Sequence, residues 1–171
     1  MFTKADIEKY FIAEKGQAMV FMVVGIVFIL LAVVLFYLHS RHLFIQGLVI
    51  PVLLIGIIQF VVGYNVHGRS DEQRSNVVYA FDMDPAKLRN VELPRMEKVT
   101  RSFGKILVGE AIFLIAGIIV FFVFRSNPEK MLLNGIAVGV MIQAIVCLVM
   151  DAIAAMRGME YMVGLTNWLN R

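Results

Sequence analysis

Glu110 is the residue of this chain whose setting most needs a chemical explanation. It lies in the stretch "KILVGEAIFLIAG", which otherwise has the apolar composition of a membrane-buried segment. A carboxylate inside a membrane is costly, and such groups serve proton relays, ion pathways or buried polar contacts. Three roles are therefore open for Glu110: a structural hydrogen-bonded clamp, part of a proton or cation pathway, and a site for a lipid headgroup or a partner.

Further polar residues are expected at a similar depth. Glu110 and Gln59 each lie five residues from the boundary of an apolar block, about 7–8 Å inside at 1.5 Å per helical residue. Asp151 follows the last apolar block on the same side, and Gln143 lies two helical turns before it on the same helix face. The sequence thus predicts an intramembrane polar cluster of Gln59, Glu110, Gln143 and Asp151.

Motifs typical of enzymes are nearly absent. His39 and His42 flank Arg41 without carboxylates nearby, which makes a poor metal site. Asp82 and Asp84 are close enough in sequence for a cation, but Asp84 precedes a proline and is explained as a helix cap. There is no HExxH, GxSxG or CxxC motif. We therefore expect no metal, no cofactor and no enzymatic activity.

The elements that must position these side chains are apolar helices. Hydrophobic residues make up 60% of the 171 residues, against about 45–50% in soluble domains, and the mean hydropathy is +0.79. The excess gathers in blocks of about 20 residues, the length that a helix needs to cross a bilayer. The blocks do not alternate as barrel strands do. The prediction is an all-α integral membrane protein, a bundle of four transmembrane helices at residues 18–38, 43–63, 106–124 and 131–150.

The distribution of basic residues predicts the orientation. Thirteen Lys and Arg lie in the terminal segments and the central loop, and three lie in the two short loops between blocks. Basic residues collect in cytoplasmic segments. Both termini and the central loop are therefore expected in the cytoplasm, with the protein multi-pass in the cell (inner) membrane. The same asymmetry explains the basic pI of about 9.1 without nucleic-acid binding.

The chain divides into five expected segments. Outside the membrane we expect an N-terminal interfacial amphipathic helix, a helical cytoplasmic loop and a C-terminal amphipathic helix. A capping box of Thr3 and Asp6 starts the first of these, and Gly16 suits a bend into the first span. For the last, the alternative is that the fourth helix projects and packs on the central loop. In chain order the segments are 1–17 (interfacial helix), 18–64 (transmembrane hairpin 1), 65–104 (cytoplasmic loop), 105–150 (transmembrane hairpin 2) and 151–171 (C-terminal helix).

Small residues recur at helical spacing within the spans. Gly135 and Gly139 form a GxxxG motif, which lets a second helix backbone approach closely. Two interpretations are open: packing within one bundle, or an interface between copies of the chain. The two hairpins also resemble each other weakly, so a duplicated hairpin is a further hypothesis. The predicted helix-packing residues are Gly56, Gly63, Gly117, Gly135 and Gly139.

Together these patterns favour a non-enzymatic polytopic membrane protein, an oligomeric scaffold or partner-binding protein with a cytoplasmic cap. The alternative is a small ion or proton channel or transporter that uses the polar cluster around Glu110. The expected partners are the lipid bilayer, further copies of the chain and a cytoplasmic protein, with no nucleic acid.

Overall fold

The computed structural model describes residues 2–170 and is built of helices, which make up 94% of the chain. Within the described residues there is no strand. The all-helical prediction with four helices able to span a membrane is confirmed. The long helices are α1 (Lys4–Leu38), α2 (Leu43–Met83), α4 (Leu93–Phe124) and α5 (Met131–Leu169). The short elements are α3 (Pro85–Lys87), the π-helix η1 (Leu88–Glu92) and the 3-10 helix η2 (Pro128–Lys130).

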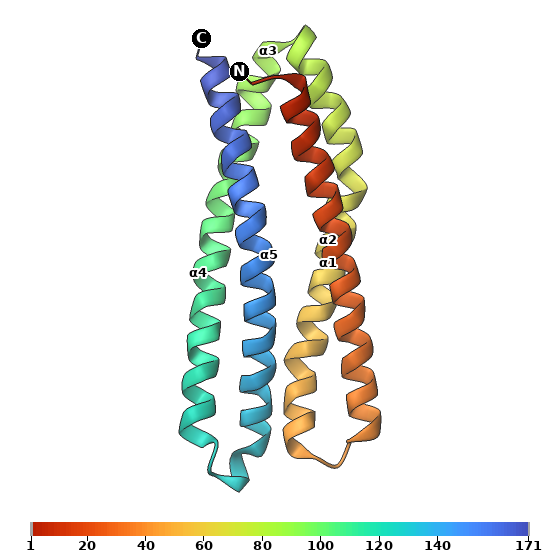
Figure 1. The fold of residues 1–171 in the computed structure, drawn as a ribbon, viewed down its shortest axis with the longest axis vertical. Coiled ribbons are helices and arrows are strands. Elements are labelled where there is room, and N and C mark those ends of the chain that lie inside the picture. Colours follow the sequence, from red (N-terminus) through yellow and green to blue (C-terminus); the bar gives the residue numbers. More distant parts are fainter. Residues whose placement is uncertain (1, 171) are drawn as a thin grey trace.

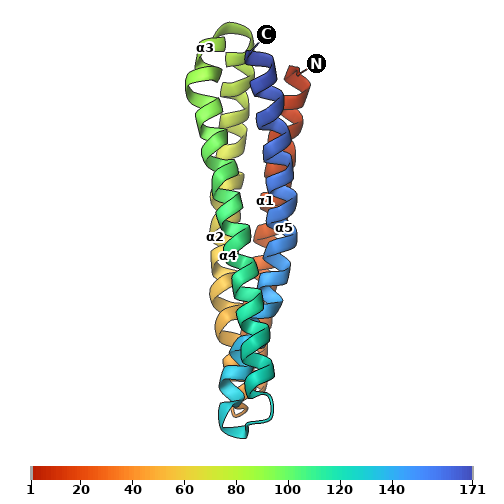
Figure 2. The ribbon, with the colours of Figure 1, turned by 90° about the vertical axis from the view of Figure 1, so that its left-hand side faces the viewer.

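The long helices run side by side along an elongated molecule (Figure 1). Both ends of the described chain lie beside α3 at one end, which we call the head end, and the two short loops lie at the other, the hairpin end. α1 packs on α2, α2 on α5 and α5 on α4, whereas α1 and α5 touch little. The molecule is accordingly narrower in the view turned by 90° (Figure 2).

The helices are much longer than a bilayer is thick. α2 has 41 residues, which corresponds to about 60 Å at 1.5 Å per residue, against a hydrocarbon layer of about 30 Å. The most apolar windows of the four helices have mean hydropathies of 2.4 to 3.3. The chain therefore has the features of a multi-pass membrane protein, and each helix must continue well outside the hydrocarbon.

The terminal segments are continuous with the spans. The expected bend at Gly16 is absent, because α1 runs unbroken from Lys4 to Leu38. The expected helical loop 65–104 is formed likewise by extensions of α2 and α4, joined by α3 and η1. Two predicted helix starts are present: the Asp6 carboxylate accepts the Thr3 backbone N–H at 2.8 Å, and the Asp84 carboxylate accepts that of Lys87 at 3.1 Å.

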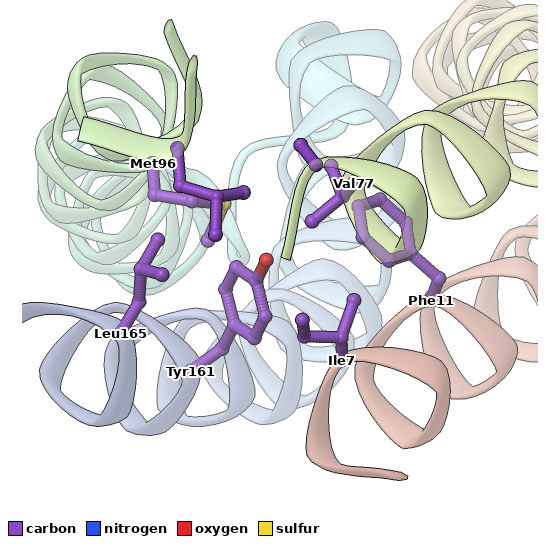
Figure 3. Packing of buried hydrophobic residues seen from close by; sticks show 8 residues of the cluster. Ile7, Phe11, Val77, Met96, Tyr161 and Leu165 are labelled. Atoms are coloured by element: carbon purple, nitrogen blue, oxygen red, sulfur yellow. The ribbon is translucent and has the colours of Figure 1, made fainter. Parts of the chain in front are cut away.

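The extensions bury their apolar faces against each other. We call residues 4–17, 65–104 and 152–169 the head. Its core takes side chains from α1, α2, η1, α4 and α5, and Tyr161 lies in it between Ile7 and Leu165 (Figure 3). The apolar stripe of the N-terminal helix, which was expected to face lipid, therefore faces protein. The C-terminal residues 152–169 also pack on the segment 65–104, as in the alternative given above for the last segment. The buried core residues are Ile7, Phe11, Val77, Ala80, Leu88, Met96, Tyr161 and Leu165.

Glycines bring the helix backbones into contact. A Cβ on Gly135 of α5 would lie 1.9 Å from the carbonyl oxygen of Phe44 in α2, and one on Gly47 would lie 2.0 Å from that of Leu132. We call this contact, made by Gly47, Gly135 and Gly139, the glycine seam. Such distances are far below any real Cβ contact, so no larger residue fits without moving a helix.

The remaining predicted glycines also lie at contacts between helices of one chain. On the α1–α2 contact, a Cβ on Gly63 would lie 2.6 Å from the Ala18 oxygen, and Gly56 meets Gly25, a glycine that the sequence analysis missed. On the α4–α5 contact, a Cβ on Gly117 would lie 2.8 Å from Cγ of Met141. All five predicted glycines thus have a partner helix within the chain.

The glycine seam predicts a large effect from one methyl group. We expect Gly135→Ala to separate α2 from α5 and to destabilise the protein by about 1–3 kcal/mol, which lowers Tm by roughly 2–12 °C for a chain of this size. Thermal unfolding in detergent measures this. Gly109→Ala is the matched control, since a Cβ there meets nothing within 4 Å, and its Tm should equal or exceed that of the wild type. If Gly135→Ala and Gly109→Ala have the same Tm, the close backbone contact at the glycine seam is contradicted.

Candidate functional site

Side chains from three helices meet in a polar site on the head side of the spans. Gln59 of α2 is buried and its Nε2 donates to Sγ of Cys147 on α5 at 3.3 Å. Glu110 of α4 and Asp151 of α5 lie close enough for their carboxyl groups to interact, and Cys147 is near both. The structure thus brings together three of the four predicted cluster residues and adds Cys147. We call these four residues the three-helix polar site.

Gln143 lies apart from this site. It is fully buried, and its Nε2 donates to the backbone oxygen of Val52 on α2 at 3.3 Å. Eight residues along α5 separate it from Asp151, a rise of about 12 Å. Gln143 therefore acts as a second polar link between α2 and α5 and does not join the carboxyl groups.

Several buried oxygens in this region have no hydrogen-bond partner in the protein. They are Oε1 of Gln59, Oε1 of Gln143 and Oε2 of Glu110. A buried acceptor without a donor costs about 1–3 kcal/mol. A proton shared between the two carboxyl groups would supply one donor, because two carboxyls in contact are most stable with one of them protonated.

A contact from α1 was missed by the sequence analysis. Nε2 of Gln17 donates to the backbone oxygen of Met150 at 2.5 Å, one residue from Asp151. This bond fastens α1 to α5, which otherwise meet mainly in the head, where Tyr10 stacks on Tyr161 and Arg157 donates to the Ala13 oxygen at 3.0 Å. Its only signal in the sequence is a polar residue directly before the first apolar block.

The three-helix polar site does not continue to the hairpin end along the α2–α5 contact. Beyond Gln143 the glycine seam holds the two backbones together. Among the described residues, the next buried polar side chain of α5 in that direction is Asn134. Its Nδ2 donates to the backbone oxygen of Phe124 at 2.8 Å, so it closes the end of α4.

The head holds a second polar arrangement, which the sequence analysis also missed. Glu92 is buried and accepts two hydrogen bonds from Arg95, at 2.8 Å from Nε and 2.7 Å from Nη2. The Tyr161 hydroxyl donates to the same carboxylate at 3.1 Å. The Arg95 guanidinium also lies over the Phe11 ring, 5.7 Å from its centroid. The i, i+3 spacing of Glu92 and Arg95 was the available signal, but burial of the pair depends on the fold.

Burial controls the protonation of the two tyrosines beside this pair. The Tyr10 and Tyr161 rings stack with centroids 4.3 Å apart. Burial, followed by the Glu92 carboxylate, raises the pKa of Tyr161 well above its ordinary value. Burial, followed by the Glu14 carboxylate, raises the pKa of Tyr10 in the same way. The head is therefore built to hold both tyrosines in their neutral form.

Comparison with protein-family models, with curated proteins and with solved structures finds no significant match to this chain.

The raised tyrosine pKa values predict alkaline destabilisation. In the unfolded chain a tyrosine loses its proton near pH 10, whereas in the folded head Tyr10 and Tyr161 keep theirs. The unfolded state then binds fewer protons, so stability falls as the pH rises above about 10, by at most about 1.4 kcal/mol per pH unit per tyrosine. Unfolding midpoints measured between about pH 8 and pH 11 should fall less steeply for Tyr161→Phe than for the wild type.

The matched control for this measurement is Tyr79→Phe, because Tyr79 is exposed. Its midpoints should follow those of the wild type over the whole pH range. If the midpoints of Tyr161→Phe fall with pH as steeply as those of the wild type, the proposed burial of a neutral Tyr161 is wrong.

Proposed function

We propose that this chain is a non-enzymatic membrane protein that holds a folded head beside the bilayer as a scaffold for a protein partner. The observation that carries the proposal is continuity: α1, α2, α4 and α5 each pass from the span into the head without a break. The core of the head joins all four. The head therefore keeps one distance and one orientation to the bilayer, as a docking platform requires.

The proposed orientation places the head in the cytoplasm and the hairpin end outside, in the cell (inner) membrane. It follows from the excess of Lys and Arg at the head end. In this orientation both termini and the segment 65–104 are cytoplasmic.

We further propose that the protein self-associates through α4. Only 6% of its most apolar window is buried within the chain, against 11% for α1 and 33% for α2 and α5. Since the predicted helix-packing glycines are used inside the chain, the proposed contact between copies depends on this bare apolar face. Native mass spectrometry of the protein in detergent measures the subunit count, and a strict monomer would contradict the contact.

A second candidate function is a proton or cation pathway through the three-helix polar site. It is favoured by the paired carboxyl groups of Glu110 and Asp151 and by the unpartnered oxygens beside them. It is the weaker candidate, because the glycine seam leaves no polar route between α2 and α5 to the hairpin end. In the scaffold proposal the same residues act as a polar clamp between α2, α4 and α5.

Ion flux distinguishes the two functions. In vesicles that contain the purified protein and a pH-sensitive dye, we expect no proton leak above that of protein-free vesicles under a potassium-diffusion potential. Flux that Glu110→Gln abolishes would instead establish the pathway. Glu129→Gln is the matched control, since Glu129 is exposed in η2 and far along α4 and α5 from the site.

Cysteine labelling tests the orientation. In a Cys147→Ser background, Ser126→Cys places a thiol in the hairpin-end loop, and Asn90→Cys places one in η1 of the head; both positions are exposed. A membrane-impermeant maleimide should label the first in intact cells and the second only after the cells are permeabilised. The reverse pattern would place the head outside the cell.

A further inference from the structure

A groove with basic residues at one end and apolar residues at the other lies beside α4, where the head meets the spans. Its volume is about 380 Å³. Arg69 of α2 and a face of α4 line it, and no carboxylate is among the lining residues. The lining residues are Arg69, Arg95, Lys98, Val99, Ser102, Phe103 and Ile106.

Two of the three cations in the groove have no acidic partner among the residues that the structure describes. Arg95 is held by Glu92, but neither Arg69 nor Lys98 is in any ion pair among the described residues. Both are exposed, as is the hydroxyl-bearing Ser102. The groove therefore offers two free positive charges and a hydroxyl group to an anion, a combination that suits a phosphate group.

Along the groove, the lining residues change from basic and polar to apolar at the level where the helices are expected to enter the bilayer. Lys98 and Ser102 lie on the head side, and Phe103 and Ile106 lie where α4 enters its apolar stretch. On α2, Arg69 lies five residues on the head side of Tyr64, an exposed aromatic residue at the end of the apolar block. Aromatic residues of this kind mark the level of the lipid headgroups.

We propose that this groove binds one anionic phospholipid. Its phosphate lies on Arg69, Lys98 and Ser102, and the start of an acyl chain lies on Phe103 and Ile106, at the head-side end of the α4 span. A phospholipid carries its negative charge and its chains in the same order as the groove carries cations and apolar side chains. The proposal requires that the four helices span a bilayer; it does not depend on the scaffold function.

Native mass spectrometry of the intact protein in detergent tests the site. The probes are phosphatidylglycerol, phosphatidylcholine with the same acyl chains, and inorganic phosphate. We expect the wild type to bind one phosphatidylglycerol in preference to phosphatidylcholine. Arg69→Gln combined with Lys98→Gln should weaken phosphatidylglycerol binding about tenfold or more, since each variant removes a direct hydrogen bond to a charged phosphate, which contributes roughly tenfold or more.

The matched control combines Arg101→Gln with Lys105→Gln, which removes the same charge from α4 outside the groove. It should bind phosphatidylglycerol as the wild type does. As a second variant, Ser102→Asp adds a negative charge at an exposed position and should weaken binding without changing Tm. Because all five positions are exposed, the variants should fold, and the thermal unfolding of each confirms it.

Three results would overturn the proposal. If the control variant loses as much phosphatidylglycerol binding as the groove variant, the effect is one of general surface charge. If the wild type binds phosphatidylcholine as well as phosphatidylglycerol, the charges of the groove do not contribute to binding. Binding of inorganic phosphate that excludes the lipid would mean a site for a free anion. The same spectra give the subunit count separately, so failure of self-association and failure of lipid binding are distinguishable.

Discussion

The close contact of α2 and α5 is the constraint on which the rest of the structure depends. It is the main contact within the spans between the α1–α2 hairpin and the α4–α5 hairpin. Between lipid-facing helices there is no hydrophobic driving force, so close van der Waals packing must hold them. Gly47, Gly135 and Gly139 permit that packing, and the links of Gln59 and Gln143 extend it toward the head.

Outside the hydrocarbon the source of stability changes. In water the apolar faces of the helix extensions associate by the hydrophobic effect. Among the described residues, the head accordingly has the larger cluster of buried side chains, and the buried Glu92 pairs with the partly exposed Arg95 beside it. A buried ion pair adds little stability in itself, but removing one partner leaves an uncompensated charge. The head is thus held together as a soluble domain is, whereas the spans are held by backbone proximity.

The sequence predicts the spans well, because a run of about 20 apolar residues has one common explanation. It also predicts that Gln59, Glu110 and Asp151 lie at one level, since helical rise alone sets their depth. It does not predict the head. The same amphipathic pattern suits a helix on a bilayer surface and a helix packed on protein, and only the partners of Ile7 and Tyr161 decide between them. Likewise, the GxxxG motif of Gly135 does not reveal whether its partner helix belongs to the same chain.

The composition of the head core has a consequence for biosynthesis. Its buried residues extend from Ile7 to Leu165 along the chain, so the core lacks components until Leu165 has left the ribosome. Each hairpin can enter the membrane as soon as it is made, because its two helices are neighbours in sequence. During that interval the head segments around Phe11 and Val77 are without their partners from α5, and they are the surfaces that a chaperone would need to shield.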